Sequence, residues 1–324
     1  MPSKRVTVWD LARETGLSTT TVSDALAGRG RVSAKTREKV HAAADRIGYV
    51  PSSVARSLRQ GRSGAIGLYL PDQTIGLDYY LQLCRGAAER ALNAGFALTL
   101  VPAWNNADLL TALHLDALLV SDPSTDDPLM DTIRRLPIPV VTCEHDLSAD
   151  ANPAAVIEID HRRGVTDLLE HLRERGARRV EAFVPPQNTG FGKELHRWFG
   201  ACDNLDVNIR SVPFVTQPEA LVDDVVDALR SRPDAIVTAP DGSAKLALDV
   251  VVEQRVSVPQ ELMLAGYTDA STHTLSRPGI TAVDLQPRLT GHRAVEAALA
   301  ALAGEEPPEF PPIEAHLRPR TTTG

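Results

Sequence analysis

From residue 65 to its C-terminus, this 324-residue chain alternates regularly between strand-like and helix-like segments. Short apolar runs that predict buried strands cover 65–70, 96–101, 117–120, 140–142, 156–159, 180–184, 212–215, 235–239, 262–267, 280–283 and 313–317. Helical patterns between them include 79–94, 163–175, 218–230, 242–253 and 287–302. Such alternation predicts an α/β fold in which helices cover both faces of parallel sheets.

Residues 65–324 exceed what one sheet comfortably organises, so we expect two lobes that face each other across a cleft. Ligands of doubly wound sheets bind beyond the carboxyl ends of the strands, which predicts a small-molecule site between the lobes. No run approaches the roughly 18 apolar residues of a membrane span, and no apolar signal segment opens the sequence. We therefore expect a cytoplasmic protein without a membrane partner.

The first 63 residues differ from the rest in charge. Residues 1–63 carry 12 Lys and Arg against 5 Asp and Glu, whereas residues 64–324 carry 22 against 37. A basic head on an acidic body suggests that the head meets a polyanion and the body does not.

The head also contains the capping and terminating residues that three short helices require. Thr7, Ser18 and Ser33 stand where short polar side chains can cap helices, and Gly16 and Gly48 stand where helices would end. Two short helices joined by a tight turn, with a third behind them, match a helix-turn-helix that can enter the major groove. On spacing alone, a three-helix bundle that binds nothing is an equally good interpretation.

A long stretch of sequence, matched without gaps, favours a DNA-binding head over an inert bundle. It comprises Val6-Thr7-Val8-Trp9-Asp10-Leu11-Ala12, Gly16-Leu17-Ser18, Thr21-Val22-Ser23, Arg31-Val32-Ser33, Thr36-Arg37-Glu38-Lys39-Val40, Ile47-Gly48-Tyr49-Val50-Pro51 and Val54-Ala55-Arg56-Ser57-Leu58. This text closely resembles the N-terminus of LacI/GalR-family transcription regulators. The resemblance implies an all-α helix-turn-helix head over residues 1–50 that binds double-stranded operator DNA.

The resemblance also assigns DNA contacts position by position. The base-reading positions are Thr19, Thr20 and Asp24, with Ser23 on the same outer face of the helix. The phosphate-holding positions, where short hydroxyl side chains lie at helix N-termini, are Thr7, Ser18, Thr21, Ser33 and Thr36. Arg31 lies in the loop that approaches the DNA.

Two departures from the family pattern bear on the operator. The family usually has Arg at the position of Asp24 and Asn at the position of Ala27. An Asp side chain cannot donate to guanine, although it can accept from cytosine N4. The operator sequence therefore cannot be copied from well-known relatives.

Residues 51–64 are interpreted as a hinge and linker, because Pro51 breaks the preceding helical pattern. The segment resembles the family's hinge helix, which orders when two copies meet in the minor groove of the operator. Leu58 then occupies the place of the apolar wedge that kinks the DNA. The neighbouring contact positions are Ala55, Arg56 and Arg59. The alternative is a plain linker in which Leu58 packs on the body.

The body resembles the family's effector domain, a two-lobed periplasmic-binding-protein-like (type I) fold with parallel sheets over residues 65–324. The supporting text includes Ile159-Asp160, Gly164, Glu170-His171-Leu172, Gly176-Ala177-Arg178-Arg179-Val180, Pro233-Asp234-Ala235, Val258-Pro259, Gly266-Tyr267-Thr268-Asp269 and Gln286-Pro287. This resemblance implies a homodimer and a small-molecule effector, a sugar or sugar derivative in many relatives.

The effector-binding positions implied by the resemblance lie at predicted strand ends and on a following helix. They are Asp72, Glu144, Glu194, Trp198, Asp241, Thr268 and Asp269. Glu194 stands where sugar-binding relatives have Arg, Pro240 replaces an Asn, and Thr268 replaces an Asp. These departures leave open a ligand other than a simple sugar. They also leave open a body that binds no ligand and serves only in dimerisation.

Other motifs carry no chemistry. Gly190-Phe191-Gly192-Lys193 has the wrong glycine spacing for a phosphate loop. The adjacent residues of Cys143-Glu144-His145-Asp146 cannot all face one metal ion. No cofactor fingerprint, metal spacing or catalytic constellation is evident, so neither a cofactor nor an enzyme is expected.

The sequence thus predicts a DNA-binding transcription regulator, most often a repressor in this family. It would bind a pseudo-palindromic operator as a dimer, under control of an effector in the interlobe cleft. The alternative is a small-molecule binding and dimerisation protein with a weak or vestigial DNA-binding head, supported only by Asp24 and Ala27. A third hypothesis, an enzyme on the two-lobed fold, lacks catalytic residues.

Overall fold

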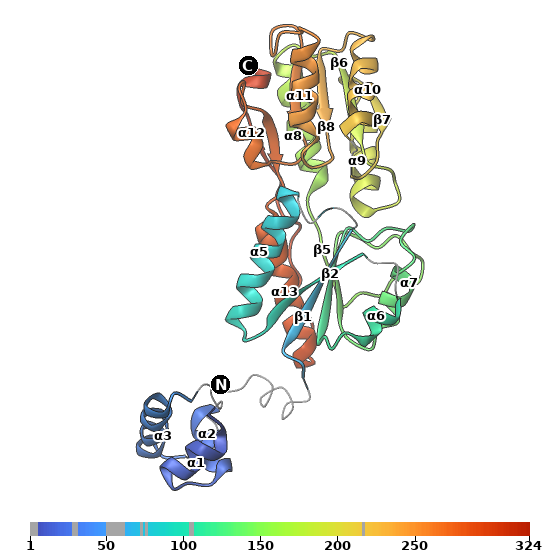
Figure 1. Cartoon of the computed structure of the whole chain (residues 1–324). Helices are drawn as coiled ribbons and strands as arrows, with labels where there is room; N and C mark the ends of the chain where they lie inside the picture. Colours follow the sequence, from blue (N-terminus) through green and yellow to red (C-terminus); the bar gives the residue numbers. More distant parts are fainter. Residues whose placement is uncertain are drawn as a thin grey trace. The chain divides into compact units, whose positions relative to one another are not determined.

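The computed structural model describes residues 6–27, 32–49, 62–71, 74, 77–103, 107–215 and 218–324. Contacts divide the chain into two compact units, Met1–Ser63 and Gly64–Gly324 (Figure 1). Several predicted site residues lie outside the described ranges, namely Arg31, Ala55, Arg56, Leu58, Arg59 and Asp72.

The described part of the head forms helices α1 (Val8–Thr15), α2 (Thr19–Ala27) and α3 (Ala34–Ile47). A capping box starts α1: the Asp10 amide donates to Thr7 Oγ1 at 3.4 Å, and the Thr7 amide donates to Asp10 Oδ2 at 2.9 Å. Gly16 ends α1 with a φ of 69°, a left-handed conformation that glycine adopts without strain.

A small apolar core holds the three helices together. Leu11, Val22 and Val40 are 0% exposed, one from each helix. Alanines complete the core, which lets the helices approach closely: Ala12, Ala25, Ala43 and Ala44. Leu26, one turn after Val22, packs against this core and is partly buried.

The first lobe of the body contains a parallel sheet in the order β2-β1-β3-β4-β5. Its strands are β1 (Ala65–Leu70), β2 (Ala97–Pro102), β3 (Ala117–Ser121), β4 (Val140–Cys143) and β5 (Ala155–Ile157). Its helices are α5 (Asp78–Asn93), α6 (Ala107–Ala112), α7 (Met130–Arg134) and α13 (Pro287–Ala303). Along β1, Leu68 joins the core under α5 and α13, whereas Tyr69 joins the core that includes residues of α6 and α7. Both faces of the sheet are therefore covered, as expected for parallel strands.

Helices α5 and α13 run side by side and approach at two glycines (Figure 1). A Cβ atom on Gly86 would lie 1.9 Å from the Arg288 carbonyl oxygen, and one on Gly291 would lie 2.1 Å from the Leu83 carbonyl oxygen. These glycines are required because no side chain fits between the two backbones. The close packing fixes the start of α5, which borders the interlobe cavity described below.

The second lobe contains a sheet in the order β11-β10-β9-β8-β6-β7, parallel except for the β10–β11 pair. Its strands are β6 (Arg179–Val184), β7 (Asp206–Ser211), β8 (Ala235–Thr238), β9 (Met263–Gly266), β10 (Thr281–Asp284) and β11 (His316–Arg318). Its helices are α8 (His161–Glu174), α9 (Gly190–Gly200), α10 (Pro218–Leu229), α11 (Ser243–Glu253), α12 (Ser271–Leu275) and the 3-10 turn η1 (Thr321–Thr323).

The chain passes between the lobes three times within the described residues, after β5, after β10 and after α13. The backbone bridge between Ile159 and Ile313 joins two of these crossings. Each lobe is therefore built from segments that are distant in the sequence. None of the described helices is long and apolar enough to cross a bilayer.

The predicted α/β fold with parallel sheets in two lobes is confirmed, and one predicted strand is wrong. Residues 212–215 follow β7 rather than forming a strand. In β7, the partly buried Val207 and Ile209 alternate with polar residues, as in a strand at the edge of a sheet. The continuous apolar run at 212–215 was the misleading signal.

Candidate DNA interface and effector site

Hydroxyl side chains gather at the helix N-termini of the head. The Ser18 and Thr21 hydroxyls lie 2.8 Å apart at the start of α2, and the Thr21 amide donates to Ser18 Oγ at 3.1 Å. Ser33 and Thr36 repeat this arrangement at the start of α3, with hydroxyls 2.8 Å apart. Helix N-termini carry a partial positive charge and outward-pointing amides, which favour phosphate oxygens.

Helix α2 buries one face and presents the other. Val22 and Ala25 are 0% and 1% exposed, whereas Thr20 is exposed and Thr19 and Asp24 are half-buried. The outer face is small and polar, and it therefore suits the approach of base edges in a groove about 12 Å wide.

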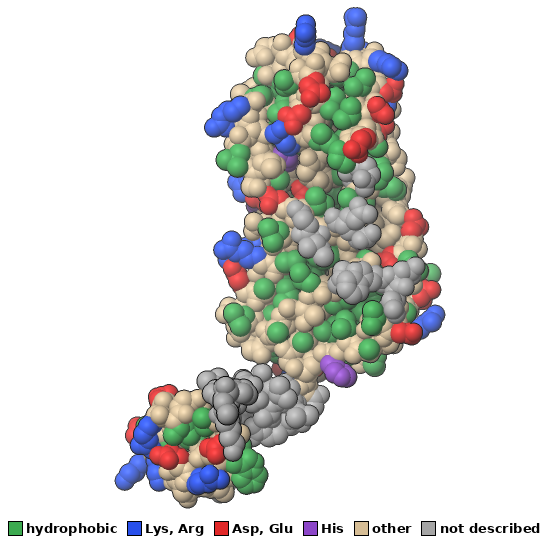
Figure 2. Space-filling view, viewed as in Figure 1, with side chains coloured by type: hydrophobic (Ala, Val, Ile, Leu, Met, Phe, Trp, Pro, Cys, Tyr) green, Lys and Arg blue, Asp and Glu red, His purple; other side chains and the backbone are tan. Residues whose placement is uncertain are grey.

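Basic side chains add positive charge to the same unit (Figure 2). Lys35 and Lys39 of α3 are exposed and make no ion pair with another described residue. Arg46 instead donates to Glu14 at 2.8 Å and ties α3 to α1. An exposed pair of this kind contributes at most about 1 kcal/mol.

In the body, a cavity lies between the two lobes at the carboxyl ends of the strands. It is partly open to solvent, and its free space including the open part is about 410 Å³. The first lobe contributes Leu77, Tyr79, Tyr80, Asp122 and Glu144, the second contributes Pro185, Phe191, Phe214, Ala239, Pro240, Asp241 and Thr268, and the crossings between the lobes contribute Ile159 and Leu285. Asp122, Glu144, Asp241 and Thr268 directly follow β3, β4, β8 and β9 or lie close beyond them, which is where doubly wound sheets bind ligands.

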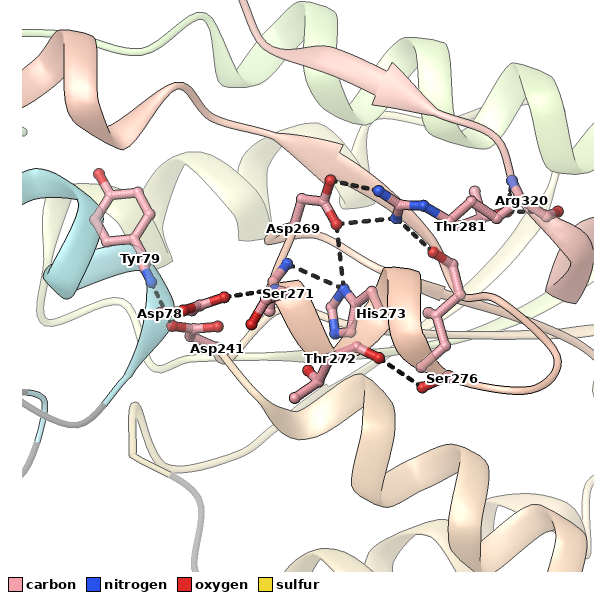
Figure 3. A network of polar contacts seen from close by, with 12 residues as sticks. Asp78, Tyr79, Asp241, Asp269, Ser271, Thr272, His273, Ser276, Thr281 and Arg320 are labelled. Atoms are coloured by element: carbon pink, nitrogen blue, oxygen red, sulfur yellow. Dashed lines mark hydrogen bonds and ion pairs between the residues drawn. The ribbon is translucent and has the colours of Figure 1, made fainter.

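Two carboxylates clasp the lobes together beside this cavity (Figure 3). The Tyr79 amide of the first lobe donates to Asp241 Oδ2 of the second at 2.8 Å. In the opposite sense, the Ser271 amide of the second lobe donates to Asp78 Oδ2 of the first at 2.5 Å. Each carboxylate therefore accepts from the N-terminal backbone of a helix in the other lobe.

Backbone and side-chain contacts also join the lobes next to an adjoining cavity. The Thr125 amide donates to the Asn188 carbonyl at 2.9 Å, and Asn188 Nδ2 donates to Asp126 Oδ2 at 2.9 Å. Asn188 and Asp126 line this second cavity, which shares Asp122 and Phe214 with the first. The two lobes of the body are therefore in direct contact.

Removing the Asp78 carboxylate should loosen this clasp. We expect Asp78→Ala to reduce the unfolding free energy of the body by about 1 kcal/mol, the usual effect of losing a capping hydrogen bond. The amide of Ser271 should exchange with solvent deuterium faster, because its acceptor is gone. Hydrogen–deuterium exchange measures this, with Asp203→Asn at an exposed site as the control. An unchanged exchange rate at Ser271 would contradict the clasp.

Burial raises the pKa of two acidic residues of the cavity, Asp122 and Asp241. Burial, followed by the nearby charge of Glu144, raises the pKa of Asp122 to about 6. Asp122 Oδ2 accepts from the hydroxyls of Tyr80 and Ser121, both at 2.9 Å. Burial also raises the pKa of Asp241, against the opposing hydrogen bond from Tyr79.

Glu144 belongs to a buried series of hydrogen-bonded side chains that links the two lobes. His161 Nε2 lies 3.1 Å from Glu144 Oε1, and His161 Nδ1 lies 3.2 Å from the Tyr267 hydroxyl. The three side chains are 5%, 2% and 0% exposed respectively. This series holds the Glu144 carboxylate in a fixed position at the cavity wall.

The predicted effector residues fall into two groups. Glu144, Asp241 and Thr268 line the interlobe cavity. Three others do not line it: Glu194, Trp198 and Asp269. The Trp198 indole donates to Glu194 Oε2 at 2.8 Å and lies beneath Arg197, whose guanidinium carbon is 4.7 Å from the ring centroid.

Asp269 lies in the polar network on the far side of the clasp (Figure 3). It accepts two hydrogen bonds from Arg320, at 2.9 and 2.7 Å, and lies 3.6 Å from His273 Nδ1. Burial opposes ionisation, but hydrogen bonds from His273 and Arg320 leave the pKa of Asp269 below its usual value. This carboxylate is therefore already satisfied by its own lobe.

Several cavity residues were not predicted from the sequence. Asp122 follows a predicted strand as directly as Glu144 does, so the strand-end rule could have found it. The aromatic members gave no such signal: Tyr79, Tyr80, Phe191 and Phe214. Among the residues described, no group of three or more His, Cys, Asp or Glu side chains is arranged to hold a metal ion.

The glycines of the motif at 190–193 have a packing role. A Cβ atom on Gly192 would lie 1.9 Å from the Pro186 carbonyl oxygen, and one on Gly190 would lie 2.8 Å from the His145 carbonyl oxygen. They allow the start of α9 to press against neighbouring backbone. This places Phe191 at the cavity wall.

Comparison with known proteins supplies the family. Residues 7–52 match the model of bacterial regulatory proteins of the lacI family, and residues 169–323 match the periplasmic binding protein-like domain. The chain belongs to the LacI/GalR family of transcriptional regulators. It pairs the family's DNA-binding helix-turn-helix head with an effector-type domain, in the order predicted from the sequence.

Curated relatives match this LacI-family regulator over most of their own length. It is 25% identical over 300 residues to catabolite control protein A of Priestia megaterium, covering 87% of this chain and 88% of that protein. It is 28% identical over 334 residues to the transcriptional repressor PurR of Escherichia coli O139:H28, covering 96% and 94%.

Solved structures share the fold. A Lac repressor dimer bound to operator and the anti-inducer ONPF has a TM-score of 0.80 at 22% identity, covering 99% of both chains. A complex of the transcriptional regulator CelR with cellobiose has a TM-score of 0.70 at 23% identity, covering 98% of this chain and 100% of the other.

Proposed function

We propose that this LacI-family regulator is a cytoplasmic repressor that binds a pseudo-palindromic operator as a homodimer. The observation that carries the proposal is the head: hydroxyl-bearing helix N-termini flank the small polar face of α2, within a match to the family's DNA-binding domain. Thr19, Thr20 and Asp24 read bases, and Ser18, Thr21, Ser33 and Thr36 hold phosphates. Two heads read the two half-sites.

The chain is organised as a head over residues 1–50, a hinge over 51–64 and a body over 65–324. The division of contacts after Ser63 supports the last of these boundaries. In the hinge, Leu58 acts as the minor-groove wedge, with Ala55, Arg56 and Arg59 beside it. Arg31 contributes a further backbone contact.

Exposed apolar side chains on the body support dimerisation. Leu81 and Leu92 of α5 are 58% and 75% exposed, and Leu275 of α12 is 75% exposed. Figure 2 shows further hydrophobic side chains at the surface of the same unit. Interfaces form where such side chains gather in one contiguous patch, and Leu81 and Leu92 of α5 are our candidates for that patch. The partner is a second copy of this chain, because a palindromic operator has two half-sites and each needs one DNA-binding head.

A small molecule in the interlobe cavity controls DNA binding. The cavity is lined by Asp122, Glu144, Asp241 and Thr268. The hydrogen bonds of the clasp, Tyr79 to Asp241 and Ser271 to Asp78, form only when the two lobes are in contact. The effector changes operator affinity only if it binds the two lobe arrangements with different affinities.

The direct test is selection of bound duplexes from a random pool with the purified full-length protein. We expect a palindromic motif with a deformable central step, and an affinity whose logarithm falls steeply with the logarithm of salt concentration. No enrichment at low salt, or binding that salt does not weaken, would instead favour a small-molecule binding protein with a vestigial head.

Two head substitutions should separate base reading from phosphate holding. Thr20→Ala is expected to relax the selected motif at one position per half-site, at about 1–3 kcal/mol per lost base contact. Ser18→Ala is expected to weaken all duplexes about equally, because it removes a helix cap and a phosphate contact without touching a base. Repeating the selection with each variant measures both effects. A motif altered by Ser18→Ala, and not by Thr20→Ala, would reverse these assignments.

A further inference from the structure

The charge of the interlobe cavity is one-sided. Three carboxylates line it, from Asp122, Glu144 and Asp241, whereas no Lys, Arg or His does so among the described residues. The adjoining cavity adds Asp126 and Asp127 and likewise has no described basic side chain. The imidazole of His161, which contacts the lining residue Glu144, is already held between Glu144 and Tyr267.

The cavity also offers acceptors that the protein does not use. Asp241 Oδ1 is buried without a hydrogen-bond partner among the described residues. Asp122 uses Oδ2 for Tyr80 and Ser121, and Glu144 uses Oε1 for His161, while their second carboxylate oxygens have no described partner. Thr268, which is 6% exposed, also lines the cavity with no hydrogen bond from its hydroxyl to a described residue. Of these acceptors Asp241 Oδ1 is fully buried, and buried acceptors without donors are rare in proteins, so a ligand that donates a hydrogen bond suits the site.

Aromatic rings frame the same space from both lobes. Tyr79 and Tyr80 meet edge to face with centroids 5.1 Å apart in the first lobe. Phe191 and Phe214 do so at 6.1 Å in the second. Ring faces attract cations and also accommodate the apolar part of a ligand, so carboxylates and aromatic rings together favour an ammonium group on an organic frame.

A neutral sugar or an anion fits this lining less well. Sugar hydroxyls both donate and accept, and a lining of carboxylates gives their acceptor lone pairs no donor. No Arg, Lys, Asn or Gln among the described residues lines the interlobe cavity. An anion would add to the charge of three buried carboxylates, which is unfavourable at low dielectric.

We propose that the effector of this regulator is a small organic cation, an amine whose ammonium group is held by Asp122, Glu144 and Asp241 between the aromatic pairs. The inference rests on the proposed function, because it names the ligand class of the same cavity. The ammonium donates hydrogen bonds to the carboxylate oxygens that the protein leaves unpaired, and Thr268 accepts or donates beside it.

The experiment uses the full-length protein and ligand pairs that differ in charge. Tyramine is compared with tyrosol, D-glucosamine with D-glucose, and cadaverine with 1,5-pentanediol, with citrate as an anion. Melting temperature is measured at pH 7.5, and ligands that stabilise the protein are titrated by calorimetry. At a hundredfold excess over the Kd, a binding amine should raise the melting temperature by about 5 °C or more, and its neutral partner should not.

Variants locate the binding. Asp122→Asn and Glu144→Gln are each expected to weaken amine binding at least tenfold, while Asp203→Asn, which removes an exposed carboxylate, leaves it unchanged. Because each variant's own melting curve shows whether it is folded, loss of binding by a folded variant supports the proposal. Stabilisation by neutral ligands or citrate but by no amine, stabilisation by nothing in the panel, or amine binding that survives both cavity variants would overturn it.

Failure of this proposal is distinguishable from failure of the proposed function. If the selected operator binds and no amine does, the regulator assignment holds and the ligand class is wrong. If amines bind at the cavity and no operator is selected, the ligand class holds and the DNA-binding assignment is wrong.

Discussion

Leu11→Ala is expected to weaken operator binding at least tenfold while leaving the body folded. Leu11 is 0% exposed at the centre of the head, and truncation of a buried Leu typically costs about 2–5 kcal/mol. A unit of this size has only about 3–9 kcal/mol of stability in total. A large share of heads would therefore be unfolded, and apparent affinity falls with the folded fraction.

Fluorescence anisotropy with the selected duplex measures the affinity, and calorimetry follows the melting of the body. Val252→Ala serves as the control, since this side chain is 53% exposed on α11 and is also aliphatic. It should change neither quantity by much. Undiminished operator affinity in Leu11→Ala would show that DNA binding does not depend on the head.

The head was predictable because its information is local. Thr7, Ser18 and Ser33 each precede a helix and accept a hydrogen bond from an amide three residues on, and these caps can be read directly in the sequence. The buried positions Val22, Val40 and Ala43 follow the helical period. Helix spacing alone did not distinguish a DNA-binding domain from an inert three-helix bundle. Only the resemblance to the family's sequence separated the two.

The body's architecture was predictable for a related reason, and its exceptions are informative. Buried parallel strands give continuous apolar runs, so β1, β3 and β6 were located to within a residue or so. The edge strand β7 has only half its residues directed inward, and its pattern was masked by the apolar run that follows it. Short helices such as α7 and α12 are too brief to show a period.

The effector cavity depends on contacts across lobes, which local patterns do not contain. Tyr79 and Phe191 lie on helices of different lobes and meet the same space only after the chain has crossed between the lobes. Glu194 was selected by position in the family pattern, yet here it accepts from Trp198 on the next turn of α9. A family pattern predicts where a residue's backbone lies better than it predicts which groups the side chain contacts.

Asp122→Asn is expected to stabilise the body at neutral pH, by up to about 3 kcal/mol at pH 7.5. Burial and the charge of Glu144 raise the pKa of Asp122 to about 6 in the folded protein, from an ordinary value of 3.8. Each tenfold change in proton affinity corresponds to about 1.4 kcal/mol. The ionised carboxylate is therefore a cost to the folded state, and an amide removes that cost while still accepting from Tyr80 and Ser121.

The pH dependence follows from the raised pKa. Because the folded-state pKa lies above the unfolded value, the folded state binds the proton more tightly. Its relative stability is intact below about pH 4, falls as the pH rises through 6, and is constant above about pH 7. The difference in unfolding free energy between Asp122→Asn and the parent protein should be near zero at pH 4 and reach its full value by pH 7. Urea denaturation at a series of pH values, with Asp203→Asn as the control, measures it.

A stabilised Asp122→Asn protein that no longer responds to effector would explain why the carboxylate is present at all. A group that weakens the fold at neutral pH has a role when a bound cation neutralises it, so the ligand supplies stability that the empty cavity lacks. The same logic predicts that saturating amine removes most of the stability difference between the two proteins. If Asp122→Asn is instead destabilised by a constant amount at every pH, the carboxylate is a structural acceptor for Tyr80 and Ser121, and its charge has no separate part in the response.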